Sequence, residues 1–261
     1  MLLRAMAHSS PELTVDPPHK RGLIHRALEP AIQLWLRSQV EHISSLSVHL
    51  EGGDRQILSG YLPHVQLNAQ KVVYRGLHLS QIELKGHNLR INIGQILKGK
   101  PLRLLEPISI ELNVSLSGED AQASLHSELL QGAIIDALQL LVGEQISDAL
   151  GQELPSEALT LKSPSLLLSD NNLRFSAVLS TREGNQSIPV ALQTGLSLSS
   201  PHALTLEHPE WLPTPHSKRG LPLHDLHGYT FDLGPQTQIQ SLQITPESIS
   251  IQGQMTVLPE V

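Results

Sequence analysis

The side chains best suited by type and spacing to do chemistry are the bases of one loop, Lys98-Gly-Lys-Pro-Leu-Arg103. Five aliphatic residues flank these cations: Ile96, Leu97, Leu102, Leu104 and Leu105. Bases beside exposed aliphatic side chains suit an anionic lipid surface, where each base contributes about 1 kcal/mol of binding free energy. The same spacing fits a solvated loop whose leucines turn inward. Spacing alone leaves both interpretations open.

A second group of candidate ligands is the histidine pair of His224-Asp-Leu-His227. His202, His208 and His216 lie nearby in the sequence. Zinc sites use three or four ligands at about 2 Å, and two histidines in a loop do not define such a site. The chain has 14 histidines, so some lie near others by chance. We therefore predict no metal site and no cofactor.

Familiar catalytic patterns are absent from the sequence. It contains no G-x-S-x-G, P-loop, dinucleotide fingerprint or H-E-x-x-H, and no cysteine that could act as a nucleophile. Aromatic residues make up only 3% of the chain, which argues against stacking on single-stranded nucleic acid. The net charge of -7 argues against binding a duplex. These features predict a protein that is not an enzyme and has no nucleic-acid partner.

Charge is distributed unevenly along the chain. Seven bases and a single acid, Glu83, lie between positions 71 and 105, in a chain whose total charge is -7. Such a basic stretch either meets an anionic partner or keeps an edge strand soluble.

The apolar periodicity predicts a helix over about 22–43 and then an antiparallel meander of alternating strands over about 46–93. A longer helix follows over 129–142, with Asp136 as its one charge. A helix that is apolar nearly all round is normally buried on several sides. The sequence therefore predicts an α+β fold, in which a strongly curved antiparallel sheet wraps around this long apolar helix. Additional strands follow in the C-terminal part.

Two local features are also predicted. The apolar positions change from odd to even numbers between Leu79 and Ile82, which predicts a β-bulge near Ser80-Gln81. Ser117 and Asp120 have capping-box spacing, which predicts a short helical turn.

The organisation predicted for the chain is a disordered segment, 1–20, followed by a single domain, 21–261. Within that domain, 21–154 is the helix-meander-helix part, and 155–261 is rich in strands with an irregular loop at about 201–228. We find neither the apolar run of a signal peptide nor a membrane span. The expected location is therefore the cytoplasm, or the cytoplasmic face of a membrane with peripheral contact.

Several segments closely resemble the LmeA-like phospholipid-binding family of bacteria, and the branch from photosynthetic bacteria is the nearest. They are EGGDRQILSG (51–60), YRGLHLSQIEL (74–84), LRINIGQILKGKPLRLLEP (89–107), GEDAQASL (118–125) and the run from 226 to 259. The resemblance implies a tubular lipid-binding type of fold and the binding of phospholipids. For the envelope member that names the family, it implies phosphoinositide-type headgroups. None of the matching segments is a catalytic motif.

Our first hypothesis is a non-enzymatic protein that binds a phospholipid or glycolipid in an aliphatic groove. The groove residues would be Leu77, Leu79, Ile82, Leu84, Leu89, Ile91, Ile93, Leu138 and Leu141. The bases expected to contact the headgroup are Arg90, Lys98, Lys100 and Arg103, which fall in the segment that resembles the family. The alternative is a structural or assembly module of a membrane-associated complex, with a dry core, no bound lipid and an unknown protein partner.

Overall fold

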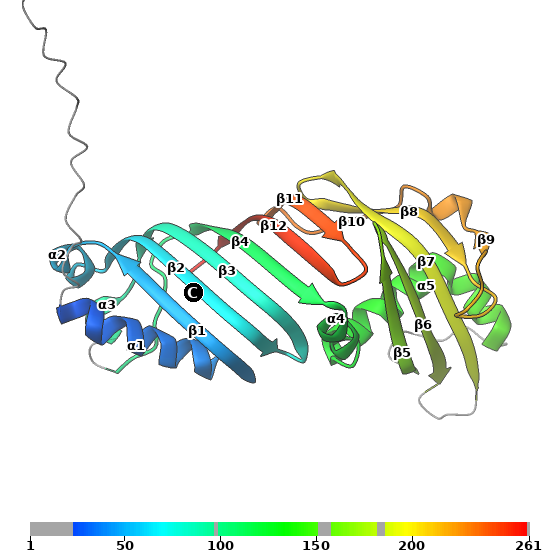
Figure 1. Ribbon diagram of the computed structural model, residues 1–261, viewed down its shortest axis with the longest axis horizontal. Helices are drawn as coiled ribbons and strands as arrows, with labels where there is room; N and C mark the ends of the chain where they lie inside the picture. The colour runs from blue at the N-terminus through cyan, green and yellow to red at the C-terminus, as the bar shows by residue number, and fades with distance from the viewer. Residues whose placement is uncertain (1–22, 97–98, 151–157, 182–185, 260–261) are drawn as a thin grey trace, which may run out of the picture.

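The computed structural model describes residues 23–96, 99–150, 158–181 and 186–259. The segment predicted to be disordered, 1–20, lies outside these described residues. The molecule is elongated, and two curved antiparallel sheets lie side by side along its long axis (Figure 1). The predicted α+β class is confirmed.

The first sheet has six antiparallel strands in the order β1-β2-β3-β4-β12-β11. They are β1 (His42–Glu51), β2 (Tyr61–Tyr74), β3 (Leu77–Arg90), β4 (Ile108–Ser117), β11 (Thr237–Ile244) and β12 (Ser248–Val257). The first four strands follow one another along the chain, as the alternating pattern predicted. The last two come from the end of the chain, and Ile251 of β12 pairs with Val114 of β4. The C-terminal hairpin therefore completes the N-terminal sheet.

The second sheet has the strand order β10-β8-β7-β6-β5, with β9 paired to β8. Its strands are β5 (Leu159–Ser169), β6 (Asn172–Thr181), β7 (Ser187–Ser200), β8 (Ala203–Trp211), β9 (Leu221–Pro222) and β10 (Thr230–Asp232). Strands β8 and β9 lie within 201–228, the stretch predicted to be irregular. A short 3-10 helix, η2 (His224–Leu226), lies in the same stretch.

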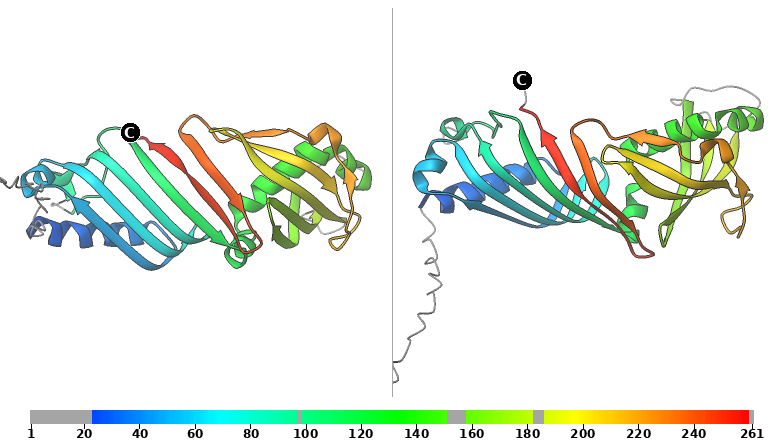
Figure 2. Two further views of the ribbon diagram at one scale, coloured as in Figure 1. Left: turned by 45° about the horizontal axis from the view of Figure 1, so that its top comes forward. Right: turned by 90° about the horizontal axis from the view of Figure 1, so that it is seen from above.

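Each sheet packs against its own helix. Helix α1 (Leu23–Ser38) contacts β1, whereas the long helix α5 (Glu128–Leu150) contacts β5 and β7 of the second sheet. Figure 2 shows this arrangement from two further sides. The sequence had placed the long apolar helix inside the N-terminal meander, and the structure corrects this placement. The chain leaves β4 through α4 (Gly118–Ser124) and enters α5 beside the second sheet.

Two further helices are short, α2 (Asp54–Leu58) and α3 (Ile93–Ile96). Most of the buried apolar side chains among the described residues form two separate clusters. The α1 cluster comprises Leu28, Ile32, Val48, Leu50, Ile57, Leu62, Leu89, Ile91, Ile93 and Ile108. The α5 cluster comprises Leu125, Ile135, Leu138, Leu159, Leu161, Phe175, Ala177, Leu179 and Val190. The hydrophobic core is therefore divided between the two sheets.

Strands β2 and β3 interrupt their alternation together. Lys71 has a left-handed backbone (φ 51°) and lies opposite Ser80, and the pairing register is the same on both sides of this point. The predicted bulge near Ser80-Gln81 is therefore not a register shift, because both strands change face at the same rung. A second such rung contains Asn88 (φ 57°). These two rungs keep apolar side chains on one face along both 14-residue strands.

Candidate functional site

The first sheet has one apolar face and one polar face. One row across all six strands is aliphatic and consists of Leu46, Ala69, Ile82, Val114, Ile251 and Leu242. The adjacent row is polar and consists of Ser45, Gln70, Gln81, Ser115, Ser250 and Gln243. Successive residues of a strand point to opposite faces, so these rows lie on opposite sides of the sheet. An apolar face of this size needs a covering layer or a ligand.

Only part of this apolar face belongs to a packed cluster. On the β1 side, Val48 and Leu50 are 5% and 2% exposed and pack with α1. Farther across the sheet lie five residues that are half-buried and belong to neither cluster of described residues. We name them the central strip: Ile82, Leu84, Leu112, Val114 and Ile251. The central strip is the candidate surface for an apolar ligand.

The nine residues predicted to line one groove do not lie together. Leu77, Leu79, Ile82 and Leu84 are half-buried and outside both clusters. Leu89, Ile91 and Ile93 are part of the α1 cluster and are at most 9% exposed. Leu138 is part of the α5 cluster, against the second sheet. The side chain of Leu141 lies outside the described residues. The sequence could not separate these groups, because all are aliphatic and similarly spaced.

The loop between β3 and β4 is held closed by a buried amide. The side chain of Asn92, 8% exposed, donates to the Pro101 carbonyl (3.0 Å) and accepts from the Arg103 amide (2.8 Å). Ile91 and Leu104 form a β-bridge beside it. Three of the flanking aliphatic residues pack on the α1 cluster: Ile96, Leu102 and Leu104. These leucines turn inward, whereas Leu105 is 58% exposed.

Three of the four predicted headgroup bases are exposed on this loop and beside it. Arg90, Lys100 and Arg103 are exposed, and Lys98 lies outside the described residues. The Arg90 guanidinium lies 5.1 Å from the centre of the Tyr61 ring, in a cation-π arrangement. The Arg90 carbonyl accepts a hydrogen bond from the Leu105 amide (2.9 Å). This ladder therefore brings Arg90 close to the Arg103 end of the loop.

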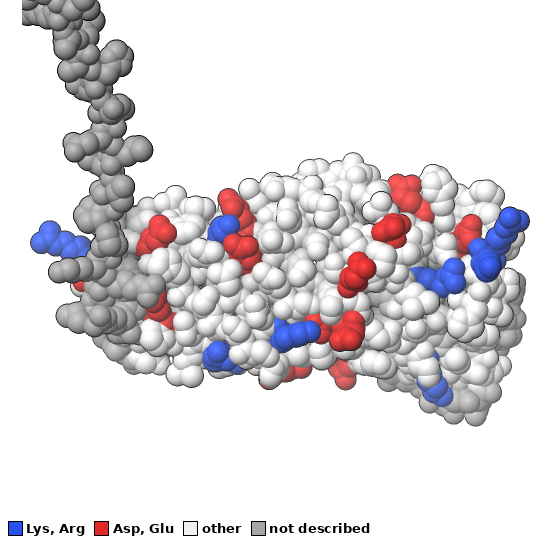
Figure 3. Space-filling view, viewed as in Figure 1, with Lys and Arg blue, Asp and Glu red and all other residues white. Residues whose placement is uncertain are grey.

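Other bases of the 71–105 stretch are paired with acids. Lys85 lies 3.0 Å from Glu83, and Lys71 lies 3.0 Å from Asp120. Figure 3 shows acidic and basic side chains interspersed on one face of the molecule. Arg75 instead lies 5.6 Å from the centre of the Tyr74 ring. Part of the excess of bases along the sequence is therefore neutralised locally, and no acid pairs with Arg90, Lys100 or Arg103 among the described residues.

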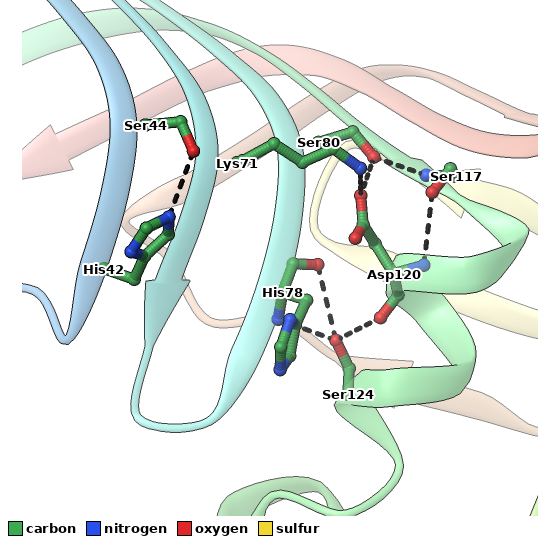
Figure 4. Close-up of polar contacts among 8 residues, drawn as sticks. All are labelled: His42, Ser44, Lys71, His78, Ser80, Ser117, Asp120 and Ser124. Atoms are coloured by element: carbon green, nitrogen blue, oxygen red, sulfur yellow. Dashed lines mark hydrogen bonds and ion pairs between the residues drawn. The ribbon is translucent and has the colours of Figure 1, made fainter.

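A cluster of polar side chains joins α4 to the first sheet (Figure 4). Asp120 accepts hydrogen bonds from the Ser80 hydroxyl and from Lys71 Nζ (3.0 Å). The Ser117 hydroxyl caps α4 by accepting from the Asp120 amide (3.1 Å), which confirms the predicted helical turn. The Ser117 amide donates to Ser80 Oγ (2.6 Å) rather than to the Asp120 carboxylate. The cluster anchors α4 at the rung where β2 and β3 change face.

This environment lowers the pKa of Asp120. Burial acts to raise the pKa and is the largest single influence, but hydrogen bonds from Ser80, Lys71 and Ser117 and the charge of Lys71 outweigh it. The carboxylate therefore stays ionised at neutral pH. Beyond the helix cap, no local sequence pattern indicates this cluster, because Ser80 and Lys71 are 40 and 49 residues away from Asp120.

Comparison with protein-family models assigns the chain to a family. In the part of the chain that the structure describes, no helix has the length and apolar character needed to cross a bilayer. Searches of the curated proteins and of the solved structures found no match. A family model described as LmeA-like phospholipid-binding matches residues 20–254, a range that includes the central strip, the β3-β4 loop and α4. The chain therefore belongs to the LmeA-like phospholipid-binding family.

Proposed function

We propose that this protein binds a phospholipid or a glycolipid without acting on it chemically, and that the acyl chains lie against the central strip. The observation that carries this proposal is the two-faced first sheet, whose apolar face continues past the α1 cluster through half-buried residues. Each methylene that an acyl chain buries there contributes about 0.8 kcal/mol. Family membership supports a phospholipid as the ligand.

The contact surface that we propose is smaller than the groove predicted from the sequence. Leu77 and Leu79 extend the central strip along β3 and are half-buried like its members. Leu89, Ile91, Ile93 and Leu138 act through packing, since each is already buried against other side chains. The acyl chains would therefore contact strands β3, β4 and β12.

The headgroup is proposed to contact Arg90, Lys98, Lys100 and Arg103. Guanidinium and ammonium groups form short, charge-assisted hydrogen bonds with phosphate oxygens. Asn92 supports this role because it fixes the loop from both sides, at Pro101 and Arg103. Contact with a membrane would then be peripheral, and we propose the cytoplasmic face.

Mass spectrometry of an organic extract tests the proposal most directly. The full chain is purified without detergent, and a stoichiometric phospholipid or glycolipid is the expected result. An extract without lipid, together with failure to float with anionic vesicles, would contradict lipid binding.

The headgroup role is tested separately by charge reversal. We expect Lys98→Glu with Lys100→Glu to weaken flotation with vesicles that contain phosphatidylserine, and to leave flotation with neutral vesicles unchanged. Lys162→Glu is the matched control, because Lys162 is an exposed base on β5 of the second sheet. Equal flotation of the double variant and the control would remove the loop from the proposal.

A second candidate function is an assembly module that binds protein rather than lipid. The observation that favours it is the inward packing of Leu102 and Leu104, which leaves fewer aliphatic side chains of the loop available to a lipid. Retention of one specific protein in a pull-down, by lipid-free material and through the same loop bases, would support this function over the first.

A further inference from the structure

We propose that Glu207, His208 and His227 bind one divalent transition metal ion, such as Zn²⁺, at the edge of the second sheet. One ligand atom from each residue lies within 4.8 Å of the other two. Two imidazoles and one carboxylate form a donor set that zinc and its neighbours in the first transition series accept. This site is separate from the central strip and goes beyond lipid binding.

The backbone brings the three residues together. Leu206 of β8 donates to the Tyr229 carbonyl (2.9 Å) and accepts from the Gly228 amide (3.0 Å). Glu207 and His208 follow Leu206 along β8, and His227 precedes Gly228 on the neighbouring segment. The ligands are therefore held by two backbone segments that are hydrogen-bonded to each other.

An irregularity in β8 sets the position of His208. The pairing of β8 with β7 shifts register here: Glu207 lies opposite Gly195, and Glu210 lies opposite Gln193. His208 falls inside this shift and has a left-handed backbone (φ 48°), which is unfavourable for a residue with a Cβ atom. The His208 ring lies beside the His227 ring, with 4.7 Å between their centres.

The carboxylate is oriented by a second residue. One oxygen of Glu207, Oε1, accepts a hydrogen bond from the Ser197 hydroxyl (2.6 Å). The other oxygen, Oε2, lies 4.0 Å from Nδ1 of His227, and a small side-chain rotation brings these atoms to the roughly 3.4 Å that separates two ligands of a tetrahedral ion. Support of a ligating carboxylate by a neighbouring hydrogen bond is typical of metal sites.

The orientation of His227 also fits a ligand. Its Nδ1 accepts a hydrogen bond from the His208 amide (3.1 Å), so the lone pair of this atom points toward β8. A metal ion bound at Nδ1 takes that lone pair and displaces the amide. Both histidines are exposed, and Glu207 and His208 also line a hollow of about 550 Å³, so an ion can reach them.

Sequence spacing alone missed this arrangement because it paired His227 with His224 inside one loop. The carboxylate ligand, Glu207, comes from β8, 20 positions before His227 in the chain. His224 lies in η2 and lines a hollow of about 280 Å³ together with His208 and His227, but it is not among the three clustered ligands.

Cobalt and zinc titrations of the full chain, after removal of metal with a chelator, test the proposal. We expect one Co²⁺ per chain with a visible d–d band, and displacement of that band by one equivalent of Zn²⁺. Zinc should also shift the amide signal of His208 in the ¹H–¹⁵N spectrum, because the ion would occupy Nδ1 of His227, which accepts the hydrogen bond of that amide. His227→Ala should weaken affinity by on the order of 100-fold, and His227→Gln should do the same while keeping the side chain's size.

The matched control is His64→Ala. His64 and His87 form the other close histidine pair of the described chain, with 3.2 Å between their Nδ1 atoms, and they lie on the first sheet. The affinity of the His64→Ala variant for Co²⁺ should equal that of the wild-type protein. The proposal is overturned if no stoichiometric binding occurs, if binding survives in both folded His227 variants, or if it is lost in His64→Ala instead.

Discussion

Asp120 of α4 and Lys71 of β2 meet at 3.0 Å, between Oδ2 and Nζ, although 49 residues separate them. The carboxylate is only 13% exposed, whereas the ammonium is 56% exposed. Helix α4 contacts β3 and β4 of the first sheet and also β5 of the second. This pair therefore fastens the helix that joins the two sheets of the molecule.

Replacing Asp120 with Asn should destabilise the protein, because Lys71 loses its counter-charge and Ser80 loses a charged acceptor. Removing a hydrogen-bonded group of this kind costs about 1–3 kcal/mol of the free energy of unfolding. Urea unfolding at pH 7 measures the loss. Glu119→Gln is the control, because Glu119 is exposed in the same first turn of α4. If Glu119→Gln lost a similar amount of unfolding free energy, the loss in Asp120→Asn would be due to the negative charge at the start of α4 and not to the contacts with Lys71 and Ser80.

The contribution of Asp120 should depend on pH in one direction. Its pKa is lowered in the folded protein from the ordinary value of 3.8, so the folded state holds the ionised form more strongly than the unfolded state does. The stabilisation is therefore complete above 3.8 and is lost as the pH falls through the lowered value. The stability difference between wild type and Asp120→Asn should be constant near neutral pH and shrink in acid. A difference that grew in acid would contradict the direction of the shift.

Two leucines on the same apolar face should respond differently to truncation. Leu50→Ala should cost about 2–5 kcal/mol, since Leu50 is 2% exposed in the α1 cluster. Leu84→Ala should cost only about 1 kcal/mol, because Leu84 is half-buried in the central strip. Leu84→Ala should instead reduce the lipid that copurifies. Equal stability losses, with lipid content unchanged in Leu84→Ala, would mean that the strip is ordinary core.

Asn92→Ala should open the β3-β4 loop. The variant removes the acceptor of the Arg103 amide and the donor to Pro101, which leaves two backbone groups without their partner. Trypsin should then cleave after Arg103 several times faster, as measured by mass spectrometry of a time course. Asn113→Ala, at an exposed position of β4, serves as the control. Unchanged cleavage in Asn92→Ala would show that the loop holds without the amide.

Two glycines should give opposite results when changed to Ala. A Cβ atom at Gly253 would lie 2.3 Å from the Gln238 carbonyl oxygen of β11, so Gly253→Ala should cost about 1–3 kcal/mol. At Gly132 of α5 a Cβ atom meets nothing within 4 Å, so Gly132→Ala should stabilise by about 0.5–1 kcal/mol. Thermal unfolding of the two variants measures both effects. If Gly253→Ala unfolded at the same temperature as the wild type, β11 would have to shift away from the added methyl group without loss of stability.

The sequence predicted the features that depend on local pattern. Alternation located the N-terminal meander, and the spacing of Ser117 and Asp120 located the start of α4. Local pattern was not decisive everywhere. Gly52-Gly53 is typical of a hairpin turn between two strands, yet the chain forms the short helix α2 after it, with Ile57 fully buried and the Gln56 side chain accepting from the Gly53 amide (2.9 Å).

Long-range pairing could not be predicted in the same way. Aliphatic side chains of β3 and α5 look alike in the sequence, yet Leu89 and Leu138 pack in separate clusters. Which cluster a residue joins depends on the path of the chain through α4. The candidate metal ligands show the same limit, since Glu207 and His227 meet only through the pairing of β8 with a later segment.

The pairing of β4 with β12 has a consequence for the order of folding. Until residues 248–257 have been synthesised, β4 has a partner on one side only, and its outer edge is open to pairing with other chains. Contacts this distant in sequence are slow to form, because a long loop must close before they stabilise anything. A nascent chain that stops before β11 therefore exposes a four-stranded, two-faced sheet with an aggregation-prone edge. Synthesis of β11 and β12, rather than the growth of the first four strands, therefore sets the moment at which the first sheet is complete.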